Sequence, residues 1–278
     1  MVHSEGTFAG DGGTKLYYQC WRPEGTAHAA LAIVHGIGEH SGRYMNVVNC
    51  LVPDGYAVYG FDLRGHGRSP GQRGFINAWS EFREDVHAFL KVVAQNEPNL
   101  PLFLMGHSLG GLIVLEYGLH YQEGLRGVIA SGPAVGKVGI SPFLFSLASA
   151  LSRVYPQFSL GTGLDATAIS RDASVVESYK ADRLVHSKGS ARLATEFASA
   201  QEWTLDHAGD WRLPLLILHG GADRLSSPEA SRAFYERVTF PDKERIEYPG
   251  GFHEPHNDTL YPQATADLKR WLNAHERN

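Results

Sequence analysis

Gly106-His107-Ser108-Leu109-Gly110 places a serine inside a Gly-x-Ser-x-Gly turn. The residues before it, 101–105, form a short apolar run that begins with a proline and indicates a buried strand. The residues after it, 112–117, are mostly apolar and indicate a helix. A strand, this turn and a helix in that order are typical of a nucleophile elbow, in which a strained turn exposes the serine hydroxyl above a sheet. Because the chain has 31 glycines in 278 residues, the flanking strand and helix give the motif its weight.

Composition excludes several classes of protein. The hydrophobic content of 43% and charged content of 20% are ordinary for a globular enzyme. A net charge of −5 leaves no basic face for nucleic acid. The two cysteines, Cys20 and Cys50, cannot form a disulfide framework or a four-cysteine zinc site. They could still form one bridge, but two reduced, partly buried thiols are expected. No signal peptide and no membrane-spanning apolar run is recognised, which favours a cytoplasmic location.

Strand and helix patterns alternate along most of the chain. This alternation predicts an α/β fold, with a mostly parallel central sheet flanked by helices and ligands bound at the carboxyl ends of the strands. A hairpin turn is expected at 11–13, and a helix at 77–95 with Asn77 as its N-cap. Further strands are expected near residues 31–34, 56–60, 101–105, 128–130, 215–218 and 246–248.

The alternation stops between residues 133 and 210. This segment shows helix-like patterns and no convincing buried strand, so it is expected to form a helical cap, or lid, inserted between core strands. Residues 1–132 and 211–278 then form the core. The apolar stretch 143–151 could be the core face of a cap helix, a wall of an acyl tunnel or a patch that contacts lipid, and the sequence leaves these readings open.

A serine nucleophile needs a base and a third group that orients the base. In α/β-hydrolases the acid and then the histidine follow the serine along the chain. Asp223 follows the strand at 215–218, and His253 follows the strand at 246–248, so both are expected at the strand ends near Ser108. The predicted catalytic residues are therefore Ser108, Asp223 and His253.

Other acids and histidines are less well placed. Asp206 and Asp210 precede their strand and would lie at the opposite edge of the sheet. His275 lies near the end of the last expected helix, and His256 is farther from its strand end than His253. His253 is therefore preferred as the base.

An oxyanion hole needs two backbone N–H groups aimed at the developing negative charge. Leu109 follows the serine at the start of its helix and is expected to supply one donor. The loop at 35–38, which is rich in glycine and follows a strand, is expected to supply the other, and Ile37 is the predicted donor.

Longer motifs accompany the elbow. They are His35-Gly36-Ile37-Gly38-Glu39-His40-Ser41-Gly42-Arg43-Tyr44, Arg64-Gly65-His66-Gly67-Arg68-Ser69 and Gly106-His107-Ser108-Leu109-Gly110-Gly111. Together with residues 168–172, 219–225 and the loop of His253, they resemble the monoacylglycerol lipase family, in particular its bacterial branch. The resemblance covers nearly the whole chain. It implies an α/β-hydrolase fold and a serine hydrolase that releases fatty acid and glycerol from monoacylglycerols through an acyl-enzyme, without a cofactor.

The resemblance also implies residues at the glycerol end of the pocket. The family places a glutamate and an arginine of the first motif, a cap tyrosine and a second histidine there, and the matching positions are Glu39, Arg43, Tyr179 and His256. The tyrosine match is the weakest, because the family's usual Asp-Pro after it is Asp-Arg here, at 182–183. Glu39 and Arg43 are four residues apart and could instead form an ion pair that shapes their loop.

Alternatives remain at this point. A lysophospholipase or a broad-specificity carboxylesterase could use the same three residues. An aminopeptidase would need cap carboxylates that converge on a free amine, and Glu177, Glu196 and Glu202 are the candidates. A binding protein could keep the fold without activity.

The two histidines at 253 and 256 lack the spacing of a zinc helix motif and enclose a proline, so no metal is expected. The expected partner is a monoacylglycerol, with transient contact to a membrane surface through the cap, and the oligomeric state stays open.

Overall fold

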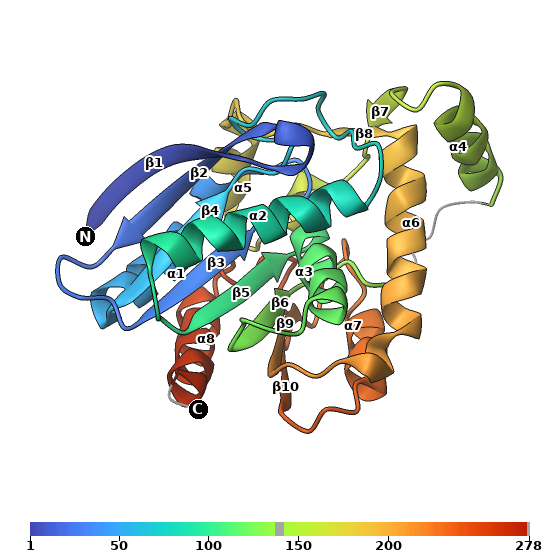
Figure 1. The fold of residues 1–278 in the computed structure, drawn as a ribbon. Coiled ribbons are helices and arrows are strands. Elements are labelled where there is room, and N and C mark those ends of the chain that lie inside the picture. The colour runs from blue at the N-terminus through green and yellow to red at the C-terminus, as the bar shows by residue number, and fades with distance from the viewer. Residues whose placement is uncertain (137–141, 277–278) are drawn as a thin grey trace.

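The central sheet is mostly parallel, as predicted. The computed structural model describes residues 1–136 and 142–276, without the side chains of 142–145. Within these residues the sheet has eight strands in the order β1-β2-β4-β3-β5-β6-β9-β10 (Figure 1). β1 and β2 form the predicted hairpin and β2 pairs antiparallel with β4, whereas the other neighbours pair parallel. The strands are β1 (Val2–Ala9), β2 (Lys15–Arg22), β3 (Ala29–Val34), β4 (Tyr56–Phe61), β5 (Leu102–His107), β6 (Gly127–Ser131), β9 (Leu215–Gly220) and β10 (Lys243–Tyr248).

Helices cover both faces of the sheet, because each central strand is apolar on both sides. In β3, Ala30 and Val34 pack into one hydrophobic cluster, whereas Leu31 and Ile33 pack into the other, as the two-residue period of a strand requires. Helices α2, α3 and α7 contribute to the first cluster, and α1 and α8 to the second. The core helices are α1 (Met45–Leu51), α2 (Ser80–Asn96), α3 (Leu109–His120), α7 (Pro228–Arg237) and α8 (Tyr261–His275).

Helix α2 begins later than expected. It starts at Ser80, and Asn77 is not its N-cap. The backbone N–H and the side-chain amide of Asn77 instead donate to the Glu81 carboxylate at 2.7 and 2.9 Å. The contact between Asn77 and Glu81 joins the turn before α2 to the first turn of the helix, and Asn77 does not cap the helix itself.

The chain between β6 and β9 lies outside the sheet and is mainly helical. Helix α4 packs on α6 at the edge of the molecule, and α6 packs on α3 of the core (Figure 1). The segment also contains a two-stranded antiparallel sheet of β7 and β8, which was not expected. Each of these strands has only three residues, too few for a strand pattern to be recognised. The elements are α4 (Pro142–Val154), β7 (Ser159–Gly161), α5 (Ala173–Ala181), β8 (Lys188–Ser190) and α6 (Ala191–Asp206).

This segment is attached to the core beside the carboxyl ends of the strands. The N–H of His186 donates to the carbonyl of Gly38 at 2.8 Å, and the N–H of Glu254 donates to the carbonyl of Ile169 at 2.8 Å. The Arg171 guanidinium donates to the buried Asp258 carboxylate. Both loops that carry predicted site residues are thus in direct contact with the segment above them.

Candidate active site

Ser108 lies in a strained turn between β5 and α3. Its backbone angles, a φ of 54° and a ψ of −115°, fall in a region that residues other than glycine rarely adopt. This backbone strain costs about 1–3 kcal/mol of folding free energy. The flanking glycines are required by close packing: a Cβ on Gly106 would lie 2.1 Å from the Gly110 carbonyl oxygen, and one on Gly110 would lie 2.2 Å from the Val34 carbonyl oxygen. The local sequence therefore forms the elbow that the motif predicted.

Asp223 and His253 form a buried hydrogen-bonded pair at the ends of β9 and β10. The Asp223 Oδ2 lies 2.7 Å from Nδ1 of His253 and 3.1 Å from Nε2 of His219. The other oxygen, Oδ1, accepts the N–H groups of Leu225 and Ser226 at 2.8 and 3.0 Å. Four contacts thus fix the carboxylate, which in turn orients the imidazole and leaves Nε2 available to a substrate or a serine.

Burial and charge shift the pKa values of this pair in opposite directions. Burial alone would raise the pKa of Asp223, but the His253 imidazole and the hydrogen bonds from His219 and His253 hold it below its usual value. Burial alone would lower the pKa of His253, but the Asp223 carboxylate outweighs it, and the net pKa of His253 is raised. The pair therefore favours a charged aspartate next to a histidine that readily takes a proton.

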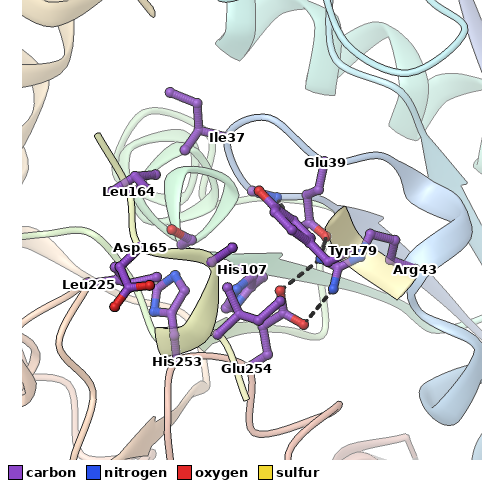
Figure 2. Close-up of a pocket in the computed structure, with 14 residues that line it drawn as sticks. Ile37, Glu39, Arg43, His107, Leu164, Asp165, Tyr179, Leu225, His253 and Glu254 are labelled. Atoms are coloured by element: carbon purple, nitrogen blue, oxygen red, sulfur yellow. Dashed lines mark hydrogen bonds and ion pairs between the residues drawn. The ribbon is translucent and has the colours of Figure 1, made fainter. Parts of the chain in front are cut away.

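One cavity contains most of the predicted site residues. Ser108 and His253 line it together with Ile37, and Leu109 is the first residue of α3, where helix N–H groups lack intrahelical partners. Leu164 and Leu225 lie on one side of the cavity together with the carboxylate of Asp165, and a cluster of charged and aromatic side chains lies on the other side (Figure 2). The apolar residues are Ile37, Leu164, Ala166, Ile169 and Leu225, and the polar end has Glu39, Arg43, Tyr179 and Glu254.

The polar end is built around Arg43. Its guanidinium donates to Glu39 at 2.7 Å and to both oxygens of Glu254 at 2.7 and 2.8 Å, and it lies 4.7 Å from the centre of the Tyr179 ring. The ion pair of Glu39 and Arg43 considered from their spacing is therefore present, and both side chains also line the cavity. Burial would raise the pKa of Glu39, but Arg43 lowers it below its usual value. Burial raises the pKa of Tyr179 to about 12.

Glu254 was not anticipated as a site residue. Its ion pair with Arg43 joins two residues that are 211 positions apart, so no local pattern indicates it. The only signal was its place directly after His253.

His256 is not part of the described cavity lining. Its ring stacks on Tyr44, with centres 4.8 Å apart, and meets the edge of His107 at 4.9 Å. It is buried, and neither ring nitrogen has a hydrogen-bond partner among the described residues. The prediction that His256 contacts glycerol stays a prediction.

The first residue of the Asp-Arg pair at 182–183 is well anchored. Asp182 follows α5 directly and accepts hydrogen bonds from His40 and from the N–H of Leu184, both at 2.8 Å. These contacts hold the end of the helix that carries Tyr179. The backbone of this segment is thus held after α5 without the family's proline.

The carboxylates considered for an aminopeptidase do not converge on the cavity. Glu177 is exposed and pairs with Lys180, Glu196 accepts the N–H of Trp79, and Glu202 is exposed. None of the three is part of the described cavity lining. Within the described part of the chain, no group of three or more histidine, cysteine or acidic side chains is arranged to hold a metal ion.

Comparison with known proteins places this geometry in a family. A family model described as serine aminopeptidase, S33, matches residues 25–260. The chain is 37% identical over 276 residues to a monoacylglycerol lipase from Mycolicibacterium smegmatis, which covers 99% of this chain and 98% of that protein. The chain belongs to the monoacylglycerol lipase family. The fold and the resemblance expected from the sequence are thereby confirmed.

Other members of the monoacylglycerol lipase family agree over nearly the same length. The human monoglyceride lipase is 29% identical over 264 residues, covering 94% of this chain and 86% of that protein. The crystal structure of a monoacylglycerol lipase from Paleococcus ferrophilus has a TM-score of 0.85 at 33% identity and covers 99% of this chain and all of that one. The structural match thus includes the segment between β6 and β9 as well as the sheet and its flanking helices.

Proposed function

We propose that this protein hydrolyses the ester bond of monoacylglycerols, and that Ser108, His253 and Asp223 carry out the reaction. The observation that carries this proposal is one cavity that Ser108 and His253 line together with several apolar side chains and with the charged cluster of Glu39, Arg43 and Glu254. A monoacylglycerol has one apolar chain and one small polar alcohol, joined at the ester. The family membership supports the same substrate class.

The proposed reaction has two halves. The Ser108 oxygen attacks the ester carbonyl carbon while Nε2 of His253 takes the hydroxyl proton, and Asp223 stabilises the imidazolium. The N–H groups of Ile37 and Leu109 hold the oxyanion. The tetrahedral intermediate then breaks its bond to the glycerol oxygen, which receives the proton from His253. Water attacks the acyl-enzyme in the same way and releases the fatty acid.

The two ends of the cavity account for the two parts of the substrate. The apolar side chains around Leu164 and Leu225 receive the acyl chain. Glu39, Arg43 and Tyr179 face the glycerol end, where their charged and hydroxyl groups suit alcohol hydroxyls. A triacylglycerol would place two further acyl chains against this polar end, so its hydrolysis is expected to be slow.

Hydrolysis of a panel of lipids tests this proposal. We expect faster hydrolysis of 1-monooleoylglycerol than of dioleoylglycerol, trioleoylglycerol or lysophosphatidylcholine, together with labelling by a fluorophosphonate that is lost in Ser108→Ala. Equal rates on the di- and triacylglycerols would contradict the substrate assignment, and a higher rate on lysophosphatidylcholine would favour a lysophospholipase. A folded protein that is not labelled at all would favour a binding protein.

We also propose that residues 133–210 form a cap that contacts lipid surfaces. Among the described residues, no helix combines the length and apolarity needed to cross a bilayer. The segment nevertheless exposes large apolar side chains, including Val154, Tyr155 and Leu160, with Leu160 at 63%. Binding to phosphatidylcholine vesicles should weaken in Leu160→Ser but not in Tyr261→Ser, which removes an apolar side chain exposed outside this segment. Equal vesicle binding by the two variants would argue against the contact.

A further inference from the structure

We propose that Glu254 is a positioning residue for ester hydrolysis, which ties the loop of His253 to the loop of Ile37 through Arg43 and Glu39. This inference rests on the proposed function, since it concerns the same base and the same oxyanion donor. Glu254 follows the base directly in the chain, and its side chain points towards Arg43 (Figure 2).

The bridge is continuous, and it is buried. Both oxygens of Glu254 accept from Arg43, at 2.7 and 2.8 Å, and the same guanidinium donates to Oε2 of Glu39 at 2.7 Å. The side chains of Arg43, Glu39 and Glu254 are 9%, 3% and 3% exposed. A bidentate arginine–carboxylate pair fixes direction as well as distance, so the two loops cannot shift independently.

The other end of the bridge reaches the oxyanion loop. Oε1 of Glu39 accepts the N–H of Gly36 at 2.6 Å and the hydroxyl of Tyr44 at 2.9 Å. Gly36 directly precedes Ile37 and packs against the nucleophile, since a Cβ at Gly36 would lie 3.2 Å from Cβ of Ser108. A shift of Glu39 therefore moves the peptide that is to hold the oxyanion.

Glu254 has little capacity left for a substrate. Oε1 accepts from Arg43, and Oε2 accepts both from Arg43 and from the side-chain amide of Asn257 at 2.9 Å. These partners hold both carboxylate oxygens in place. Its contribution is therefore expected in the geometry of the reacting groups rather than in the affinity for glycerol.

The bridge also affects the charge around the base. Two carboxylates and one guanidinium carry a net charge of −1 beside His253. Three carboxylates favour the protonated form of His253: Asp223 after β9, Glu254 on the same loop and Glu39 after β3. The rings of His107 and His256 also lie close to His253. Removing the charge of Glu254 should therefore lower the pKa of His253.

The substitution Glu254→Gln tests the proposal with two esters. p-Nitrophenyl butyrate has no glycerol, so it reports the reacting groups alone, whereas 1-monooleoylglycerol reports glycerol contacts as well. We expect kcat to fall about 10- to 100-fold on both esters with KM changed less than threefold, because misplacement of reacting groups acts on the chemical step. The acid limb of the pH profile should also move to lower pH, which loss of packing alone would not produce.

Glu247→Gln is the matched control, because it removes a carboxylate that pairs with Arg232 and Arg245 away from the cavity. If Glu254→Gln leaves kcat on p-nitrophenyl butyrate within twofold of the unmodified protein, the proposal is overturned. The proposal also fails if only KM for 1-monooleoylglycerol rises, since that result identifies a glycerol contact.

Glu39→Gln breaks the same bridge from its other end and keeps the proposal testable if Glu254→Gln does not fold. We expect a similar loss of kcat on p-nitrophenyl butyrate, and a double variant no slower than about the slower single variant. Independent, additive losses would contradict a shared bridge. An unmodified protein that hydrolyses p-nitrophenyl butyrate but not 1-monooleoylglycerol would overturn the proposed substrate and leave this inference standing, whereas a protein inactive on both would overturn both.

Discussion

Asp223→Asn tests the proposed base most directly, because it exchanges one oxygen for an NH₂ group. The N–H groups of Leu225 and Ser226 donate to Oδ1, so the amide oxygen of an asparagine must take that position. The NH₂ group then takes the place of Oδ2, 2.7 Å from Nδ1 of His253. Since an NH₂ group can only donate, Nδ1 must accept and the ring proton moves to Nε2. His253 then cannot take the proton of Ser108.

The expected loss follows from this change of tautomer. A serine hydrolase whose catalytic histidine is in the wrong tautomer loses about 10⁴-fold in kcat, or roughly 5 kcal/mol of transition-state stabilisation. Hydrolysis of p-nitrophenyl butyrate and the rate of fluorophosphonate labelling should both fall by this order, while the thermal unfolding curve shows a folded protein.

Asp242→Asn provides the matched control for this substitution. Asp242 forms an exposed pair with His275 at 3.1 Å, outside the cavity lining. Its kcat should stay within twofold of the unmodified protein. A folded Asp223→Asn variant that keeps more than about 1% of the unmodified kcat would refute the assignment of the base.

Three further predictions concern pH and stability. Because the pKa of His253 is raised and only the neutral ring accepts a proton, kcat/KM should increase with pH through a midpoint above about 6.5, measured by pH-stat titration; a midpoint well below this value would contradict the raised pKa. Gly110→Ala should prevent folding or lower the unfolding temperature sharply, because its Cβ would meet the Val34 carbonyl oxygen, whereas Gly25→Ala, with open space around it, should leave thermal unfolding almost unchanged. Arg43→Met should lower the free energy of unfolding by about 3–5 kcal/mol at pH 7, because it leaves two buried carboxylates unpaired. In urea titrations this deficit should shrink as the pH falls below about 5, where carboxylates bind protons and the charge is lost; a deficit that does not depend on pH would point to lost packing instead.

The residues at the strand ends were the predictable part of the site. Ser108, Asp223 and His253 each follow a strand with a clear apolar pattern, and β5, β9 and β10 end at the same edge of the sheet. In a parallel sheet, the strand pattern and the chain order therefore bring distant residues together without further information.

Contacts that depend on side-chain direction could not be predicted. Glu254 turns towards Arg43 and His256 turns towards Tyr44, although both lie within three residues of His253. No periodic pattern fixes such directions in a loop. Likewise, β7 and β8 pair over three residues each, a length at which the tertiary contacts and not the local sequence decide the structure.

The backbone conformation at position 108 and the proposed reaction favour different residues there. A φ of 54° with a ψ of −115° suits glycine, which would relieve most of the strain, whereas the proposed reaction needs a hydroxyl there. Relative to a net folding stability of about 5–15 kcal/mol, a strain of about 1–3 kcal/mol is a substantial share. Selection for thermal resistance alone would therefore enrich glycine at position 108, and such variants would be more stable as they lost the nucleophile.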